Sequence, residues 1–121
     1  MLRHARQALP SEAVGILGGD VDGRVQIAIP LPNLAGYRGF VADPLAQYRA
    51  ERTLSAHGLA QLGVYHSHPG GGVQLSPLDC SLASPTVQVV IALGCEHHVG
   101  AEIRAYRVSG GSAAEVAIRI A

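Results

Sequence analysis

Apolar and polar positions in the first quarter of the chain predict a short helix followed by a β-hairpin. Leu2, Ala5, Arg6 and Leu9 form an amphipathic helical pattern that Pro10 stops. Apolar residues 13–17 follow, and residues 24–29 alternate between apolar and polar. The Gly- and Asp-rich stretch between these two segments is typical of a turn that joins antiparallel strands.

A longer helix is expected between residues 43 and 57. Asp43 suits the N-cap position, and Pro44 suits the first helical position, where its missing N–H costs nothing. Gly58 can end this helix at a left-handed C-cap. Residues 33–42, which precede the helix, show no periodicity and read as a loop, whereas residues 62–68 are rich in β-branched and aromatic side chains and predict a strand.

Three more strands are expected in the last third of the chain. The apolar run 87–93 favours a central strand that is covered on both faces. Residues 103–108 and 115–120 alternate, with the turn residues 110–112 between them. With a short helix after Pro77, the pattern predicts one α+β domain over residues 1–121. Its central β-sheet is mixed or mostly antiparallel and is flanked by helices.

Composition narrows the class of protein. The chain has 121 residues, of which 48% are apolar and 15% charged, which is typical of a globular protein and not of a disordered one. Nine basic residues, all arginine, balance nine acidic ones, so a nucleic-acid partner is not expected. There is no apolar run of the ~20 residues that a membrane helix requires, and no signal-peptide core, so we expect a cytoplasmic protein without a membrane partner.

The two cysteines carry no expected chemistry. Cys80 and Cys95 match neither a zinc-binding CxxC pair nor a disulfide framework. We expect both to be small buried apolar residues.

A candidate metal site lies in residues 63–79. His66 and His68 are two positions apart in the predicted strand, so their imidazoles project from the same face. Such a pair suits one Zn²⁺ ion, and the glycine run after Pro69 lets the backbone turn back, so that Asp79 could return as a third ligand. Two histidines and one carboxylate leave a fourth position open, which is typical of catalytic zinc.

Glu12 is the candidate general base. It stands where the first predicted strand begins, and a carboxylate in that position is poorly explained by solvation. It is explained if the side chain reaches a cleft and takes a proton from water.

Other interpretations of these residues stay open. Taken alone, the two histidines are typical of a strand with ordinary hydrogen bonds. With Asp79 they also match the triad of an Fe(II) oxygenase, although such enzymes usually have jelly-roll folds. His97 and His98 read as an exposed turn, with a second metal site as the alternative. The loop 33–42 also has two interpretations. It either only connects its neighbours, or it contacts the substrate through its bulky residues Tyr37, Arg38 and Phe40.

The spacing of these residues resembles a known family. The residues are Pro-Ser-Glu at 10–12, Gly-Val-Tyr-His-Ser-His-Pro at 63–69, and a Ser-x-x-Asp motif at 76–79 with seven residues between His68 and Ser76. Together with the segment 40–44, this pattern resembles the JAMM (MPN+) zinc metalloprotease family in its minimal prokaryotic branch.

The resemblance implies a fold, an activity and a role for each residue. The fold would be the MPN architecture, which is similar to that of cytidine deaminases. His66, His68 and Asp79 would bind one Zn²⁺, Glu12 would be the general acid and base, and Ser76 would help to stabilise the oxyanion. The substrate would be a peptide or isopeptide bond at the C-terminal tail of a ubiquitin-like or sulfur-carrier protein. A non-catalytic scaffold of the same fold remains an alternative, and a homodimer is left open.

Overall fold

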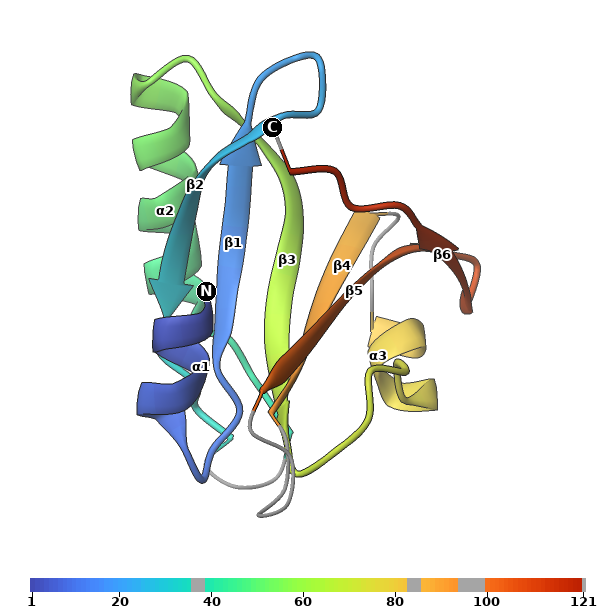
Figure 1. Cartoon of the computed structure of the whole chain (residues 1–121). Coiled ribbons are helices and arrows are strands. Elements are labelled where there is room, and N and C mark those ends of the chain that lie inside the picture. Colours follow the sequence, from blue (N-terminus) through green and yellow to red (C-terminus); the bar gives the residue numbers. More distant parts are fainter. Residues whose placement is uncertain (36–38, 83–85, 94–99, 121) are drawn as a thin grey trace.

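A computed structural model describes residues 1–35, 39–82, 86–93 and 100–120, and its framework is one six-stranded β-sheet (Figure 1). The strand order is β2-β1-β3-β4-β5-β6. β3 and β4 are parallel, and every other neighbouring pair is antiparallel. The strands are β1 (Val14–Gly19), β2 (Val25–Leu31), β3 (Ala60–Pro69), β4 (Thr86–Leu93), β5 (Ala101–Ser109) and β6 (Ser112–Val116). The predicted mixed, mostly antiparallel sheet is confirmed.

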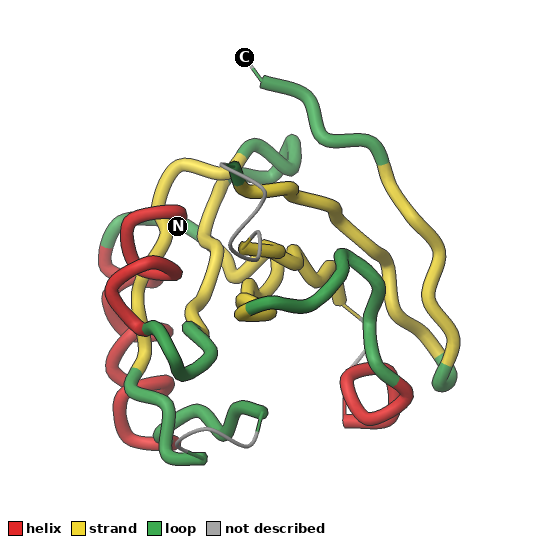
Figure 2. The backbone as a smooth tube through the Cα atoms, turned by 60° about the horizontal axis from the view of Figure 1, so that its bottom comes forward, coloured by secondary structure: helices red, strands yellow, loops and turns green. Residues whose placement is uncertain are grey.

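Helices cover both faces of this sheet. They are α1 (Leu2–Ala8), α2 (Pro44–Ala56) and α3 (Pro77–Leu82). α1 packs on one face, where it contacts β4, while α2 packs on the other face against β1, β2 and β3. α3 stands apart from the other two helices, near β6 (Figure 2). Among the described residues, no helix is both long and apolar enough to cross a membrane.

Strand alternation in β3 divides the core into two layers. Tyr65 is fully buried in the layer beneath α1, together with Ala5 and Leu17. His66, the next residue, points to the opposite face, since its register partner Val14 packs in the layer beneath α2. The same period of two therefore places His66 on the α2 side of the sheet and directs Tyr65 towards α1.

The ends of α2 follow the capping rules. The Asp43 side chain accepts a hydrogen bond from the backbone N–H of Leu45 at 3.0 Å, and Pro44 takes the first helical position. Gly58, just beyond the C-cap His57, has a φ of +67°, a left-handed conformation that favours glycine. The prediction of this helix is confirmed.

The last strand differs from its prediction. We expected residues 115–120, whereas β6 is Ser112–Val116 and residues 117–120 lie outside the sheet. The turn has only two central residues, Gly110 and Gly111, both with positive φ, so Ser112 already pairs with Ser109. Alternation shows that a segment can form a strand, but the turn decides where pairing begins.

β2 also extends beyond its prediction, which ended at residue 29. The strand continues through Pro30 to Leu31. Because β2 is an edge strand, Pro30 needs no N–H for a neighbour on the open side.

Candidate metal centre

The two histidines of β3 lie side by side, as the strand period predicts. Their Nε2 atoms are 3.1 Å apart. The side chain of His66 is fully buried and that of His68 is 14% exposed. Two nitrogen atoms therefore converge at the end of β3 on the face that α2 covers.

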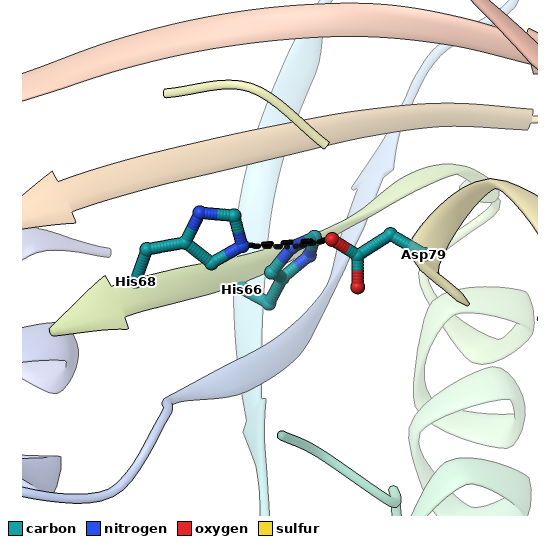
Figure 3. Close-up of side chains that lie close together, drawn as sticks. All are labelled: His66, His68 and Asp79. Carbon is teal, nitrogen blue, oxygen red and sulfur yellow. Dashed lines mark hydrogen bonds and ion pairs between the residues drawn. The ribbon is translucent and has the colours of Figure 1, made fainter. Parts of the chain in front are cut away.

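Asp79 reaches the same point from the first turn of α3. Its Oδ2 atom lies 3.5 Å from Nε2 of His66 and 3.6 Å from Nε2 of His68 (Figure 3). Ser76 and Asp79 also form a reciprocal helix cap. The N–H of Ser76 donates to Asp79 Oδ2 at 2.8 Å, and the N–H of Asp79 donates to Ser76 Oγ at 3.1 Å. The cap fixes the carboxylate against the two imidazoles.

The three donor atoms fit a tetrahedral metal ion. Bonds of 2.0–2.1 Å at a tetrahedral angle separate two ligand atoms by about 3.3 Å. The observed separations of 3.1, 3.5 and 3.6 Å scatter around this value. His66, His68 and Asp79 could therefore hold a metal ion, with nitrogen and oxygen donors of the kind that zinc and iron accept.

The glycine turn after β3 orients His68. Its Nδ1 lies 2.8 Å from the carbonyl oxygen of Gly72. Because a carbonyl can only accept, Nδ1 carries the proton in the neutral form of the ring, and Nε2 of that form keeps a lone pair for a metal. The chain reverses through Gly70, which has a φ of +67°, and the N–H of Gly71 donates to the His68 carbonyl at 3.2 Å. The expected return of the backbone is confirmed.

An aromatic side chain packs against the His66 ring. The ring of Phe40 stacks on its imidazole with centroids 4.7 Å apart and an interplanar angle of 28°. The Nδ1 atom is buried and has no hydrogen-bond partner among the described residues. Phe40 thus covers one face of the His66 imidazole.

Asp79 and His68 influence each other's protonation. Burial alone would raise the pKa of Asp79, but hydrogen bonds from His66, His68 and the N–H of Ser76 hold this pKa well below its usual range. The hydrogen bond with Asp79 is the main cause of a raised pKa at His68. The Asp79 carboxylate is therefore ionised, which suits a residue that binds a metal cation.

Glu12 lies in the connection between α1 and β1, near enough to these three residues for their charges to affect the pKa of its carboxyl group. Burial raises the pKa of its carboxyl group, the charges of His66 and His68 oppose that shift, and the charge of Asp79 adds to it. Its Oε2 atom would be 3.8 Å from a Cβ built on Gly39. The structure thus places all the residues that we expected at the site in one region.

Two residues near the site were missed in the sequence. Asn33 donates from Nδ2 to the carbonyl oxygen of Glu12 at 2.9 Å. Gln88, which is 3% exposed, donates to the carbonyl oxygen of Asp79 at 3.3 Å and so ties α3 to the sheet. Both carried a weak signal, since Asn33 is the only asparagine of the chain and Gln88 interrupts an apolar run.

The remaining expectations have mixed outcomes. Cys80 lies on α3 and is only half-buried, so the prediction of a buried cysteine was wrong for this position. Five other residues for which we stated an expectation lie outside the described part of the chain: Tyr37, Arg38, Cys95, His97 and His98.

Comparison with known proteins places this geometry in a family. Residues 1–109 match the family described as prokaryotic homologs of the JAB domain (Prok-JAB). A curated protein of Thermus thermophilus, named "Probable TtuB-protein conjugate cleaving protease", is 39% identical over 90 residues. The match covers 73% of this chain but only 60% of that protein, so this chain aligns with less than two thirds of the relative's length.

Solved structures share the fold. The solution structure of a Desulfitobacterium hafniense protein is 34% identical with a TM-score of 0.84, covering 96% of this chain and 82% of that one. A Salinibacter ruber protein is 25% identical with a TM-score of 0.69, covering 95% and 81% of the two chains. A JAB1/MPN domain protein from Archaeoglobus fulgidus, 22% identical with a TM-score of 0.64, covers 99% and 87% and has the same fold. The chain belongs to the JAB/MPN family, in its group of prokaryotic homologs.

Proposed function

We propose that this chain is a zinc-dependent peptidase or isopeptidase that releases a group from the C-terminus of a ubiquitin-like sulfur-carrier protein. The main support is the convergence of two imidazole nitrogens and one carboxylate oxygen at tetrahedral spacing. The name of the Thermus relative, a TtuB-protein conjugate cleaving protease, supports the substrate class.

The chemistry would be divided between the metal and Glu12. A bound zinc ion would act as a Lewis acid on the scissile carbonyl and would lower the pKa of water. Glu12 would take the proton from the attacking water and deliver it to the leaving amine. The raised pKa of its carboxyl group supports this role, since a base whose pKa lies closer to neutrality also returns its proton more readily.

Ser76 would stabilise the oxyanion that forms on the carbonyl. Its Oγ atom already accepts a hydrogen bond from the N–H of Asp79, so it serves as a helix cap. Within the described part of the chain the hydroxyl proton has no acceptor, so it can donate, and the residue is exposed to solvent beside the third ligand. The capping and catalytic roles are therefore compatible.

Two alternatives are tested by the same protein sample. An Fe(II) oxygenase would use the same ligand set, but the observed sheet is not a jelly roll, and that reaction gives Glu12 no part. A non-catalytic scaffold would bind the partner without turnover. Metal analysis of protein purified without added metal separates zinc from iron, and turnover separates an enzyme from a scaffold.

The experiment uses a sulfur-carrier protein joined through its C-terminal carboxyl to the ε-amine of a fluorescent lysine peptide. Intact mass should show release of the unmodified carrier by the zinc-loaded protein. Glu12→Gln should keep zinc and lose turnover by about 10²- to 10⁴-fold. Glu51→Gln, an exposed change of the same type on α2, is the matched control and should be fully active. Full turnover in zinc-loaded Glu12→Gln would remove Glu12 from the mechanism.

A further inference from the structure

The backbone around Glu12 is tied to β3 by the residue between the two histidines. The N–H of Ala13 donates to Oγ of Ser67 at 2.8 Å, and the N–H of Ser67 donates to the carbonyl of Ala13 at 3.0 Å. Ser67 is fully buried. A polar side chain in this position would be costly without a partner, and its partner is the peptide group that follows Glu12.

Asn33 holds the same segment from the other side. Its Nδ2 donates to the carbonyl oxygen of Glu12 at 2.9 Å and to that of Gly39 at 3.1 Å. Its Oδ1 accepts from the N–H groups of Ala35 and Val41, both at 3.0 Å. Because carbonyls only accept and N–H groups only donate, these four partners fix the orientation of the amide, and they use its full hydrogen-bonding capacity.

Gly39 and Phe40, in the loop that Asn33 holds, border Glu12 and the candidate metal ligands. Gly39 has a φ of +77° and lies next to the Glu12 carboxylate. The following residue, Phe40, stacks on His66. One amide therefore sets the distance between the backbone of Glu12 and the aromatic side chain that covers a candidate ligand.

We propose that Asn33 and Ser67 are positioning residues that form a clamp on Glu12 and set the rate of the proton transfers rather than the binding of metal or substrate. This inference rests on the proposed function, because it assigns the effect to Glu12. Proton transfer requires the carboxylate within hydrogen-bond reach of the water and of the leaving amine, and an error of 1 Å in such placement costs on the order of 10²-fold in rate.

Asn33→Asp tests the clamp with the smallest change. The carboxylate keeps the acceptor for Ala35 and Val41 but loses both donors and turns an oxygen towards the carbonyls of Glu12 and Gly39. With the fluorescent carrier conjugate, we expect kcat to fall by about 10- to 100-fold. KM and the zinc content of the purified protein should not change. Gln61→Glu, an exposed amide-to-carboxylate change at the far end of β3, should match the wild type.

A double-variant comparison identifies the residue through which Asn33 acts. If the effect passes through Glu12, Asn33→Asp should slow a protein that already carries Glu12→Gln by less than twofold, so that the two effects are not additive. The clamp would be overturned if the two losses of kcat multiplied in the double variant. It would also be overturned if kcat were unchanged in Asn33→Asp, or if only KM changed.

Folding is checked by circular dichroism at the assay temperature. If Asn33→Asp does not fold, Ser67→Ala tests the other side of the clamp, since it removes the acceptor for the N–H of Ala13 and should show the same non-additive loss of kcat. Full activity of Glu12→Gln would overturn the proposed mechanism and the clamp with it. An inactive Glu12→Gln beside a fully active Asn33→Asp would overturn the clamp alone.

Discussion

Gly15 is expected to be essential to the packing of β3 on the α1 side. It is the direct register partner of Tyr65 in the β1–β3 pair. A Cβ atom at position 15 would fall on the ring atoms Cε1 and Cζ and on the hydroxyl of Tyr65. The ring cannot easily move aside, because it is fully buried and its hydroxyl lies 2.9 Å from Nδ1 of His4. Gly15→Ala should therefore displace Tyr65 and break its contact with α1.

The cost follows from three contributions. Overpacking of a filled core costs about 1–3 kcal/mol, and the lost hydrogen bond of the Tyr65 hydroxyl costs about 1 kcal/mol more. The lower entropy of the unfolded alanine chain returns about 0.4–1 kcal/mol. We expect Gly15→Ala to reduce the free energy of unfolding by about 2 kcal/mol, which lowers the melting temperature by about 8 °C for a chain of this size.

Urea denaturation followed by circular dichroism measures this loss. Gly100→Ala is the matched control, because no atom of the described residues lies within 4 Å of the added Cβ and φ is not left-handed, and it should be neutral or slightly stabilising. Tyr65→Val in the Gly15→Ala protein should cost less than it does in the wild type, since the clash is then relieved. A Gly15→Ala protein within about 0.5 kcal/mol of the wild type would refute the steric argument.

Three further predictions concern the site and α1. Asp79→Asn should leave the protein with little zinc after purification without added metal, since an amide is a weaker donor than a carboxylate, and one zinc per chain in that variant would exclude Asp79 as a ligand. Ser76→Ala removes the helix cap and should lower the free energy of unfolding, measured by urea denaturation, by about 1 kcal/mol. An unchanged urea midpoint would contradict the capping role. Burial, helped by the charge of the N-terminus, lowers the pKa of His4, so the unfolded chain binds this proton more tightly than the folded one. The contribution of neutral His4 to stability should therefore be fully present above about pH 6.5 and be lost as the pH drops. The stability of the wild type should fall more than that of His4→Gln. A difference in urea midpoint between these two proteins that stays constant from about pH 7.5 to 5 would contradict this.

The sequence was most informative where a local rule determines the structure. Asp43 and Pro44 define the start of α2, and the period of two in β3 places His66 and His68 on one face. The C-terminal hairpin shows the limit of such patterns. Alternation predicts a strand over residues 115–120, whereas the tight turn at residues 110–111 makes pairing begin at Ser112.

The site was only partly predictable from the chemistry of its residues. The return of Asp79 to the histidines depends on how α3 packs on the sheet, so the glycine run left it only as a possibility, and the family resemblance assigned Asp79 as a ligand. Asn33 was missed because its role lies in backbone contacts to Glu12 and to Gly39. No sequence pattern shows which carbonyl groups a fold brings to one amide.

The parallel pairing of β3 and β4 has a thermodynamic consequence. Parallel strands need a crossover connection, and α3 with Asp79 lies in the crossover between these two. An unfolded chain can present two imidazoles close together, but the carboxylate joins them only when the crossover is closed. A metal ion should therefore bind the native state far better than the denatured ensemble, so that resistance to unfolding rises with the logarithm of the free metal concentration above its dissociation constant.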